Sequence, residues 1–210
     1  VADSFKIGYY EVPTGWKYFI HLMDSNRITF CGEESFGAGA AHIREKDGIW
    51  ATLFWLSIIA ETGKSVKEIA LDHWRKYGRS YYLRNDFEGI PQETADKLMA
   101  DLKAKLPALS GKSFGNFIVS DAYPFVYNDP VDHTSTQNGL IVHFTDGSRI
   151  VYRLSGAGTN GATLRTYIER YVTDKLEENP EDMLRELCRV SREISEITSR
   201  TGKELPDIVT

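Results

Sequence analysis

The sequence predicts two regions of different fold class: a partial α/β domain, with a parallel or mixed sheet and helices, followed by an α+β domain. In the first region strand-like and helix-like segments alternate, which favours a parallel sheet. The second region places the turn dipeptide Asp146-Gly147 between two apolar runs, which favours an antiparallel hairpin. Because the composition changes after Gly78, we expect domains over residues 1–78 and 79–210.

Spacing and end signals predict the elements of the first region. Pro13 ends a strand-like run, and Thr14 is placed to cap the helix that follows. Gly63 terminates a long apolar helix that we expect to be buried, and Ser65-Val66-Lys67-Glu68 is a capping box. The expected elements are strands over Phe5–Val12 and Arg27–Cys31, and helices over Trp16–Met23, Lys46–Thr62 and Ser65–Tyr77.

The second region has a different rhythm. Pro91 marks a helix start, and the residues after it carry an apolar stripe at helical spacing. Gly202 ends the last expected helix. The expected elements are helices over Gln92–Lys105, Gly161–Leu176 and Pro180–Arg200, two strands within Lys112–Tyr127, and hairpin strands over Leu140–Phe144 and Arg149–Leu154, with helices flanking an antiparallel sheet.

Composition excludes several classes of function. A net charge of −5 argues against a general nucleic-acid binder, which would be basic. Cys31 and Cys188 are too few for a disulfide framework or a structural zinc site, so we expect a cytoplasmic protein. The five histidines share no metal-ligand spacing, and no metal site is expected in this chain. The most apolar run, Gly48–Ala60, is too short to span a membrane.

An acidic turn rich in small residues is the first candidate site. Glu33 and Glu34 stand beside the hydroxyl of Ser35, and the cations Arg44 and Lys46 follow at the edge of the long apolar helix. Acceptors next to cations suit a ligand that is polyhydroxylated at one end and anionic at the other. A sugar phosphate is such a ligand.

A glycine-rich segment, Arg153–Arg165, is the second candidate site. Its three internal glycines before Ala162 allow a tight turn and close approach to a ligand. A helix expected from Gly161 would add backbone N–H groups that favour an anion. Arg153 and Arg165 bracket the segment and can grip a phosphate. The alternative is a glycine-rich connector with two solvated arginines.

The two segments together resemble the α-D-phosphohexomutases, and the phosphoglucomutases among them. The resemblance extends in the expected order over nearly the whole chain, and it is therefore specific. The matching stretches are VPTGWKYF (Val12–Phe19), CGEESFG (Cys31–Gly37), HIREKDG (His42–Gly48), DHWRKYGR (Asp72–Arg79), DPVD (Asp129–Asp132), FTDGSRIVYRLSG (Phe144–Gly156) and GATLR (Gly161–Arg165).

The resemblance implies the end of domain 3 and the whole of domain 4 of a four-domain isomerase of carbohydrate metabolism. That enzyme interconverts glucose 1-phosphate and glucose 6-phosphate through glucose 1,6-bisphosphate, with Mg²⁺. The GEESFG loop would contact sugar hydroxyls and the domain 4 loop would hold the non-reacting phosphate. The implied sugar contacts are Thr14, Gly15, Glu33, Ser35 and Lys46, and the implied phosphate contacts are Arg153, Ser155, Gly156, Ala157, Gly158 and Arg165.

Departures from the family pattern limit what this chain is expected to do. The segment of the phosphorylated serine, like TASHNPGG, and the metal loop, like DGDGDR, do not occur in it. Phosphoryl transfer needs both, so we expect no catalytic residue here and no activity of the chain alone. Ala157 stands where the family usually has Thr, which removes one hydroxyl donor.

Two readings of the chain stay open at this point. The first is the substrate-binding part of an enzyme, whose partners would be a sugar phosphate and the missing N-terminal domains 1–3. The second is a non-catalytic sugar-phosphate-binding or structural module. The chain begins with Val1 in strand-like sequence and looks like a fragment, so we also expect an oligomer that covers the truncated domain. No nucleic acid or membrane partner is expected.

Overall fold

The computed structural model describes residues 1–158 and 161–210, which divide into two compact units. The first, called the N-terminal unit, comprises Val1–Tyr77 and Val126–Asn138. The second, called the C-terminal unit, comprises Gly78–Phe125 and Gly139–Thr210. A short segment from the second half of the sequence therefore belongs to the first unit.

The N-terminal unit contains short helices and a small hairpin. The expected strand over Phe5–Val12 is wrong, because residues 7–13 form neither helix nor strand. The chain instead starts with a single helical turn that ends at Lys6, whose φ is 54°. The elements are α1 (Ala2–Phe5), α2 (Lys17–Asp24), β1 (Phe30–Gly32), β2 (Ala38–Ala40), α3 (Gly48–Thr62) and α4 (Val66–Tyr77).

The sheet of this unit, within residues 1–158 and 161–210, is a two-stranded antiparallel hairpin of β1 and β2. The parallel or mixed sheet expected for this region is not shown by these residues, because the acidic turn sends the chain straight back and pairs β2 antiparallel with β1. The strand expected near Arg27–Cys31 is confirmed in type, with bounds moved toward the turn.

The helix ends of this unit test the capping predictions. The capping box before α4 is confirmed: Ser65 N–H donates to Glu68 Oε2 at 2.8 Å, and Glu68 N–H donates to Ser65 Oγ at 3.3 Å. Gly63 ends α3 with a φ of 64°. The cap expected from Thr14 is wrong, because α2 begins after Trp16 without a side-chain cap bond.

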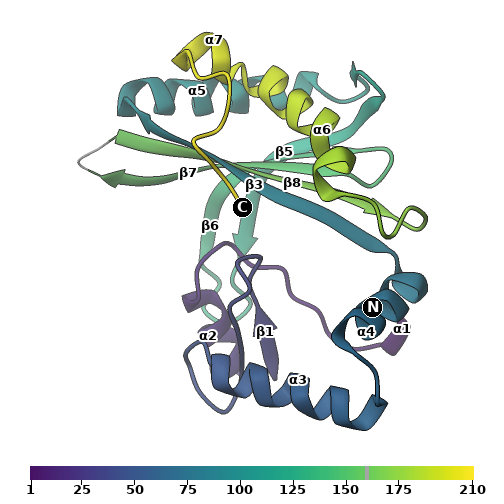
Figure 1. The fold of residues 1–210 in the computed structure, drawn as a ribbon. Coiled ribbons are helices and arrows are strands. Elements are labelled where there is room, and N and C mark those ends of the chain that lie inside the picture. Colours follow the sequence, from purple (N-terminus) through teal and green to yellow (C-terminus); the bar gives the residue numbers. More distant parts are fainter. Residues whose placement is uncertain (159–160) are drawn as a thin grey trace. The chain divides into compact units, whose positions relative to one another are not determined.

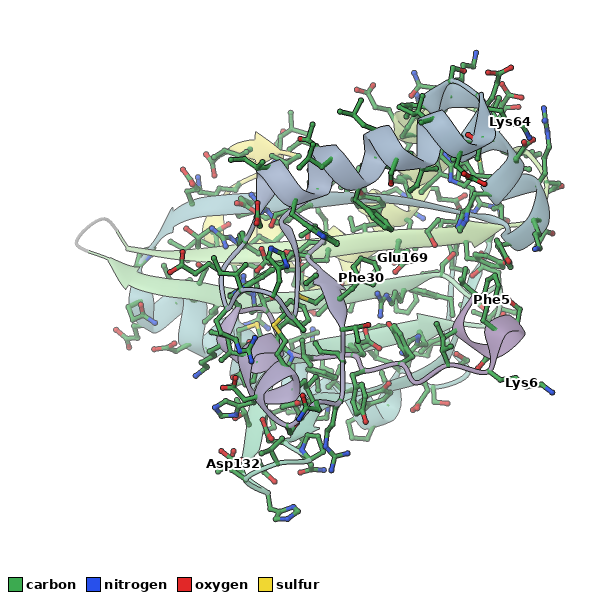
Figure 2. The ribbon with its side chains drawn as sticks, turned by 90° about the horizontal axis from the view of Figure 1, so that it is seen from below. Phe5, Lys6, Phe30, Lys64, Asp132 and Glu169 are labelled. Carbon is green, nitrogen blue, oxygen red and sulfur yellow. The ribbon has the colours of Figure 1, made fainter. Side chains whose placement is uncertain are left out.

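Helix α3 is apolar on all sides and has no buried residue in the structure. Ile49 is 77% exposed and Leu53 is 61% exposed, so the expected burial of this helix does not occur. Side chains project freely along it as far as Lys64 (Figure 2). The remaining described residues of the unit are too few to cover it, and Trp50 stacks on Phe54 within the helix itself.

The tip of a hairpin from the second half of the chain completes the core of the N-terminal unit. The hairpin strands are β5 (Phe117–Asn128) and β6 (Ser135–Phe144), and Asp132 lies at the tip (Figure 2). Tyr127 packs edge-on against Tyr18 of α2, and the nearly buried Asp129 accepts a hydrogen bond from His21 at 3.1 Å. Leu22, on the same helix as Tyr18 and His21, is 0% exposed.

The C-terminal unit is built on a curled antiparallel sheet with the strand order β4-β5-β6-β7-β8-β3-β9. The hairpin predicted from Asp146-Gly147 is confirmed, with Leu140 opposite Tyr152 across β6 and β7. The remaining elements are β3 (Arg79–Ile90), α5 (Gln92–Lys105), the 3₁₀ turn Leu106–Ala108, β4 (Ser113–Phe114), β7 (Arg149–Gly158), β8 (Gly161–Val172), α6 (Pro180–Ser195), α7 (Ile197–Thr201) and β9 (Ile208–Val209).

The helix expected over Gly161–Leu176 is wrong, because Gly161–Val172 forms strand β8. Burial alternates along it residue by residue: Leu164 and Ile168 are buried, and Arg165 and Tyr167 between them are partly exposed. This is the period of two of a strand. The apolar positions that suggested a helix also fit that period in part, and β-branched and aromatic residues favour a strand.

The core of the C-terminal unit lies between one face of the sheet and the helices α5, α6 and α7, which all lie on the same side of it (Figure 1). The last expected helix is confirmed but is divided at Glu196, whose φ is 55°. The opposite face of the sheet carries both charged and apolar side chains, among them Arg153, Arg165 and Val151. The fully buried core side chains include Phe87, Leu98, Leu102, Tyr152, Leu164, Leu184 and Leu187.

Replacing Leu187 by Ala is expected to lower the free energy of unfolding by about 2–5 kcal/mol, because this side chain of α6 is 0% exposed and its removal leaves a cavity. Chemical denaturation followed by circular dichroism measures the change. Leu205→Ala is the matched control, since Leu205 is 71% exposed, and it should change stability by less than about 0.5 kcal/mol. Equal effects of the two substitutions would contradict this placement of the core.

Candidate functional site

The acidic turn is a tight connection between β1 and β2. Glu33 N–H donates to the Gly37 carbonyl at 2.8 Å, and Phe36 N–H donates to the Glu33 carbonyl at 3.1 Å. Phe36 has a φ of 68°, and its side chain is 84% exposed. The turn therefore presents Glu34, Ser35 and Phe36 outward while it directs the Glu33 side chain back toward the unit.

The Glu33 carboxylate is the centre of the turn. It forms an ion pair with Lys46, and it accepts a hydrogen bond of 3.3 Å from Ser35 Oγ. Its side chain is only 10% exposed, whereas that of Lys46 is 52% exposed. Lys46 Nζ also lies 5.7 Å from the centre of the Trp16 ring. The structure thus brings together three of the predicted sugar contacts, Glu33, Ser35 and Lys46.

Gly37 is required for this arrangement. A Cβ atom at Gly37 would lie 2.8 Å from Glu33 Oε2 and 2.9 Å from Lys46 Cδ. Real Cβ atoms do not approach other atoms so closely, so with a larger residue the ends of the Glu33 and Lys46 side chains would have to shift from these positions. The small residues that first drew attention to the turn therefore make room for the ion pair.

Thr14 and Gly15, the other two predicted sugar contacts, lie before α2. Gly15 has a φ of 135°, which favours glycine, and Thr14 is exposed. Within residues 1–158 and 161–210, no hydrogen bond or ion pair joins either residue to Glu33. Their neighbour Trp16 contacts the segment between β2 and α3, since its Nε1–H donates to the Arg44 carbonyl at 2.9 Å.

Two other polar residues near the turn have structural partners. Arg44 Nε donates to Asp24 at 2.5 Å, which leaves Lys46 as the cation at Glu33. His42 contacts Asp47 at 2.9 Å. Asp47 caps α3 through the Trp50 N–H at 2.8 Å, and this bond, together with His42, holds the pKa of Asp47 below its usual value.

The second site lies on the sheet face away from the helices of the C-terminal unit. Strands β7 and β8 place Arg153 directly opposite Arg165, and β3 places Asp86 opposite Arg165 on the other side. In the same pairing Arg84 faces Tyr167. We call these five residues, Arg84, Asp86, Arg153, Arg165 and Tyr167, the arginine face.

Asp86 is the acidic residue of the arginine face, and its side chain is 2% exposed. Arg84 Nε donates to Asp86 Oδ1 at 2.8 Å, and Arg165 Nε lies 3.3 Å from Asp86 Oδ2. The second contact is an ion pair without an aligned hydrogen bond, because Arg165 Nε is buried without a hydrogen-bond partner. Arg153 is held differently, by a bond of 2.7 Å from its terminal NH2 to the Tyr167 hydroxyl.

The described part of the predicted phosphate loop consists of the end of β7 and the start of β8. The helix N-terminus expected after it is absent from the described residues, since β8 starts at Gly161, so no helix dipole contributes there. Ser155 pairs with Thr163, and an irregularity in β7 follows, where Gly156 has a φ of 54°. The side chain of Ala157 and residues 159–160 lie outside the described part, and Gly158 is described only as backbone.

Sequence reasoning missed Arg84, Asp86 and Tyr167. The domain boundary expected near Gly78 to Arg84 leaves no place for a strand, although the run Tyr81-Tyr82-Leu83 within that segment is typical of one. That signal could have found β3. Only the strand pairing, however, places Arg84 and Asp86 beside Arg165.

Neither a metal centre nor a membrane-spanning helix is found in the described part of the chain. Within residues 1–158 and 161–210, no three His, Cys, Asp or Glu side chains gather as they would around an ion. No helix in these ranges is long and apolar enough to cross a membrane. The residues described here therefore do not fit the Mg²⁺ that the family resemblance implies for the whole enzyme.

Both regions of the chain match models of known protein families. Residues 79–207 match the family model "Phosphoglucomutase-1, C-terminal domain". Residues 1–77 match the model "Phosphoglucomutase/phosphomannomutase, alpha/beta/alpha domain III". Both matches are to models of phosphoglucomutase or phosphomannomutase domains. The chain belongs to the phosphoglucomutase family, of which it is a C-terminal portion.

Individual relatives agree with this assignment. The chain is 48% identical to phosphoglucomutase of Rhizobium radiobacter over 213 residues and 48% identical to human phosphoglucomutase-1 over 219 residues. It is also 46% identical to human phosphoglucomutase-like protein 5. Each comparison covers 100% of this chain but 39% of the relative, so the chain spans about two fifths of their length.

A solved structure is similar over the same extent. The open form of the phosphoglucomutase pp63/parafusin from Paramecium superposes with a TM-score of 0.90 at 42% sequence identity. The match covers 100% of this chain and 37% of that one.

The thiol of Cys31 should report on the charge of Glu33. Burial, followed by the negative charge of Glu33, raises the pKa of Cys31 to about 11. Only the thiolate is nucleophilic, so alkylation of Cys31 should be slow at pH 8 and should rise with pH up to about this value. Glu33→Gln removes the second cause and should therefore lower the pKa and speed alkylation.

Mass spectrometry of the alkylated peptides separates Cys31 from Cys188. Glu34→Gln is the matched control, because Glu34 is exposed on the same turn and does not contribute to the shift. An unchanged rate in Glu33→Gln would mean that the Glu33 side chain is not an ionised neighbour of the thiol.

Proposed function

We propose that the chain is the substrate-binding C-terminal portion of a phosphoglucomutase that interconverts glucose 1-phosphate and glucose 6-phosphate. The observation that carries the proposal is the placement of Arg153 directly opposite Arg165 on neighbouring strands. Like charges in this position destabilise a sheet, and Asp86 offsets only part of the charge. An anion such as a phosphate group supplies the missing counter-charge.

The acidic turn is proposed to recognise the sugar. Glu33 can accept hydrogen bonds from two adjacent hydroxyls, and its ion pair with Lys46 holds the carboxylate in place. Ser35 is exposed beside it and can donate or accept. Thr14 and Gly15 are proposed as further sugar contacts on the family resemblance alone. The parallel sheet expected for residues 1–78 also remains a prediction, in line with the α/β/α description of the matched model.

In the proposed reaction these residues bind and orient but do not react. A carboxylate accepts from hydroxyls of either orientation, which suits a substrate that turns around as its bisphosphorylated form, glucose 1,6-bisphosphate. Arg153 and Arg165, with Ser155, Gly156, Ala157 and Gly158 at the end of β7, are proposed to hold the phosphate that is not reacting. Mg²⁺ would supply charge neutralisation in the whole enzyme, outside the residues described here.

The alternative is a non-catalytic sugar-phosphate-binding or structural module. Ala157 favours it, because an alanine cannot donate the hydrogen bond of the hydroxyl usually found there. Similarity does not separate the two, since the chain is nearly as similar to a phosphoglucomutase-like protein as to phosphoglucomutases. A phosphoserine segment and a metal loop in the preceding reading frame would support the enzyme.

We infer a cytoplasmic location in either case, and association with N-terminal domains or with a second copy remains a proposal.

Arg153→Ala is expected to weaken binding of glucose 1-phosphate by about tenfold or more, because it removes a charge-assisted hydrogen bond of about 1.5–3 kcal/mol. Glu33→Gln should also weaken it, through loss of an ionic acceptor for the sugar hydroxyls. Isothermal titration calorimetry measures both effects. Arg185→Ala, at a 75% exposed arginine of α6, is the control and should bind like the parent. If neither Arg153→Ala nor Glu33→Gln weakens binding, the site assignment fails.

The 210-residue chain is expected to bind glucose 1-phosphate without converting it, because the phosphorylated-serine segment of the family pattern does not occur in its sequence. A coupled assay for glucose 6-phosphate should show no turnover above the blank, with or without added Mg²⁺. Turnover that persists after repeated purification would overturn the assignment of a purely binding role.

A further inference from the structure

The arginine face contains one acidic residue, Asp86, which has no role in the phosphate binding proposed above. Asp86 lies on β3 between β8 and β9, opposite both Arg165 and Ile208. A carboxylate in an anion site opposes the binding of the anion by like-charge repulsion. Its presence there therefore calls for a compensating function.

The contacts of Asp86 show what that function can be. It meets both neighbouring arginines through Nε, at 2.8 Å for Arg84 and 3.3 Å for Arg165. A guanidinium has five N–H donors, so contact at Nε leaves the two terminal nitrogens available as a fork. Within residues 1–158 and 161–210, no hydrogen bond engages the terminal nitrogens of Arg84 or Arg165.

Asp86 is held firmly enough to orient both side chains. Its carbonyl accepts the Asp207 N–H at 2.9 Å. The neighbouring Arg84 exchanges two backbone hydrogen bonds with Thr210, of 2.7 and 3.0 Å. The carboxylate thus rises from a strand that is paired on both edges, and its burial restricts its side chain further. Donors fixed before a ligand arrives lose less conformational entropy on binding.

The charge of the arginine face also fits a phosphate monoester. Arg84, Arg153 and Arg165 outnumber the single carboxylate of Asp86 by two positive charges. A phosphate monoester carries about two negative charges at neutral pH. Arg84 is as necessary to this balance as the two arginines that flank the hairpin turn.

We infer that Asp86 is a positioning residue that holds Arg84 and Arg165 by their Nε atoms and turns their terminal nitrogens toward the bound phosphate, and that Arg84 is a further phosphate-binding residue. The inference rests on the proposed function, because it assigns roles within the same phosphate site. Asp86 itself does not touch the phosphate.

Two variants test these roles by titration with inorganic phosphate and with glucose 1-phosphate. Arg84→Lys keeps the charge, but a single ammonium cannot contact Asp86 at one nitrogen and the ligand at two others. It should weaken binding of both ligands by about tenfold. Asp86→Asn keeps the shape and removes the charge, and it should also weaken binding by about tenfold because both arginines lose their anchor.

The sign of the Asp86→Asn effect separates positioning from simple charge balance. If Asp86 only lowers the positive charge, its removal should tighten phosphate binding. Tighter or unchanged binding in Asp86→Asn would therefore overturn the positioning role, and unchanged binding in Arg84→Lys would overturn the role of Arg84. In the double variant, Asp86→Asn should add little to Arg84→Lys, whereas full additivity would contradict action through the arginine.

A control variant and the parent complete the design. Arg149→Lys alters another arginine of β7 on the same face, whose Nε lies 2.5 Å from Glu169 of β8. Glu169 is labelled in Figure 2. It should bind phosphate like the parent, and an equal loss there would overturn the specific role of Arg84. Thermal denaturation confirms folding, and Arg84→Lys decides the case if Asp86→Asn does not fold. Absence of binding by the parent itself would instead refute the proposed function.

Discussion

The pairing register of β7, β8 and β3 is the constraint on which both the core and the arginine face of the C-terminal unit depend. Side chains of a strand alternate between two faces, so the register that buries Leu164 and Ile168 also places Arg165 on the opposite face. A slip of one residue would move the charges of the arginine face toward the helices and the apolar side chains into solvent. The hydrophobic core therefore fixes the geometry of the site without contacting it.

Both candidate sites have the same kind of charge pairing, although one lies in a turn and the other on a sheet. At each site a nearly buried carboxylate is placed against cations: Glu33 against Lys46 in a glycine-rich turn, and Asp86 against arginines on a sheet. A buried charge is tolerated only when it is paired. In each case the pairing leaves some hydrogen-bonding groups available. The Glu33 carboxylate can still accept hydrogen bonds at the turn, and the terminal nitrogens of Arg84 and Arg165 can still donate them on the sheet. These capacities are the ones that the proposed binding of a sugar phosphate uses, with hydroxyl groups at the turn and a phosphate group at the sheet.

Local signals in the sequence predicted much of this structure, and their failures are equally informative. The Asp146-Gly147 hairpin and the Ser65–Glu68 capping box were correct because the residues that decide them are neighbours in sequence. The helix expected at Gly161 was wrong because apolar positions in so short a segment fit two periods, and strand partners decided between them. The position of Asp86 beside Arg165 could not be predicted for a related reason. The two residues are far apart in the sequence, and no local signal indicates that they face each other.

The docking of the β5–β6 hairpin tip on α2 has a consequence for how the two halves of the chain can be separated. The backbone passes from one unit to the other at three places, after Tyr77, after Phe125 and after Asn138. A gene cut at any single one of these places yields a piece of sequence that is not a structural unit. Exchange of one half between relatives would have to carry Tyr127 and Asp129 together with the Tyr18 and His21 that receive them. The segment Val126–Asn138, thirteen residues long, therefore has to match α2 whenever one half of the chain is exchanged.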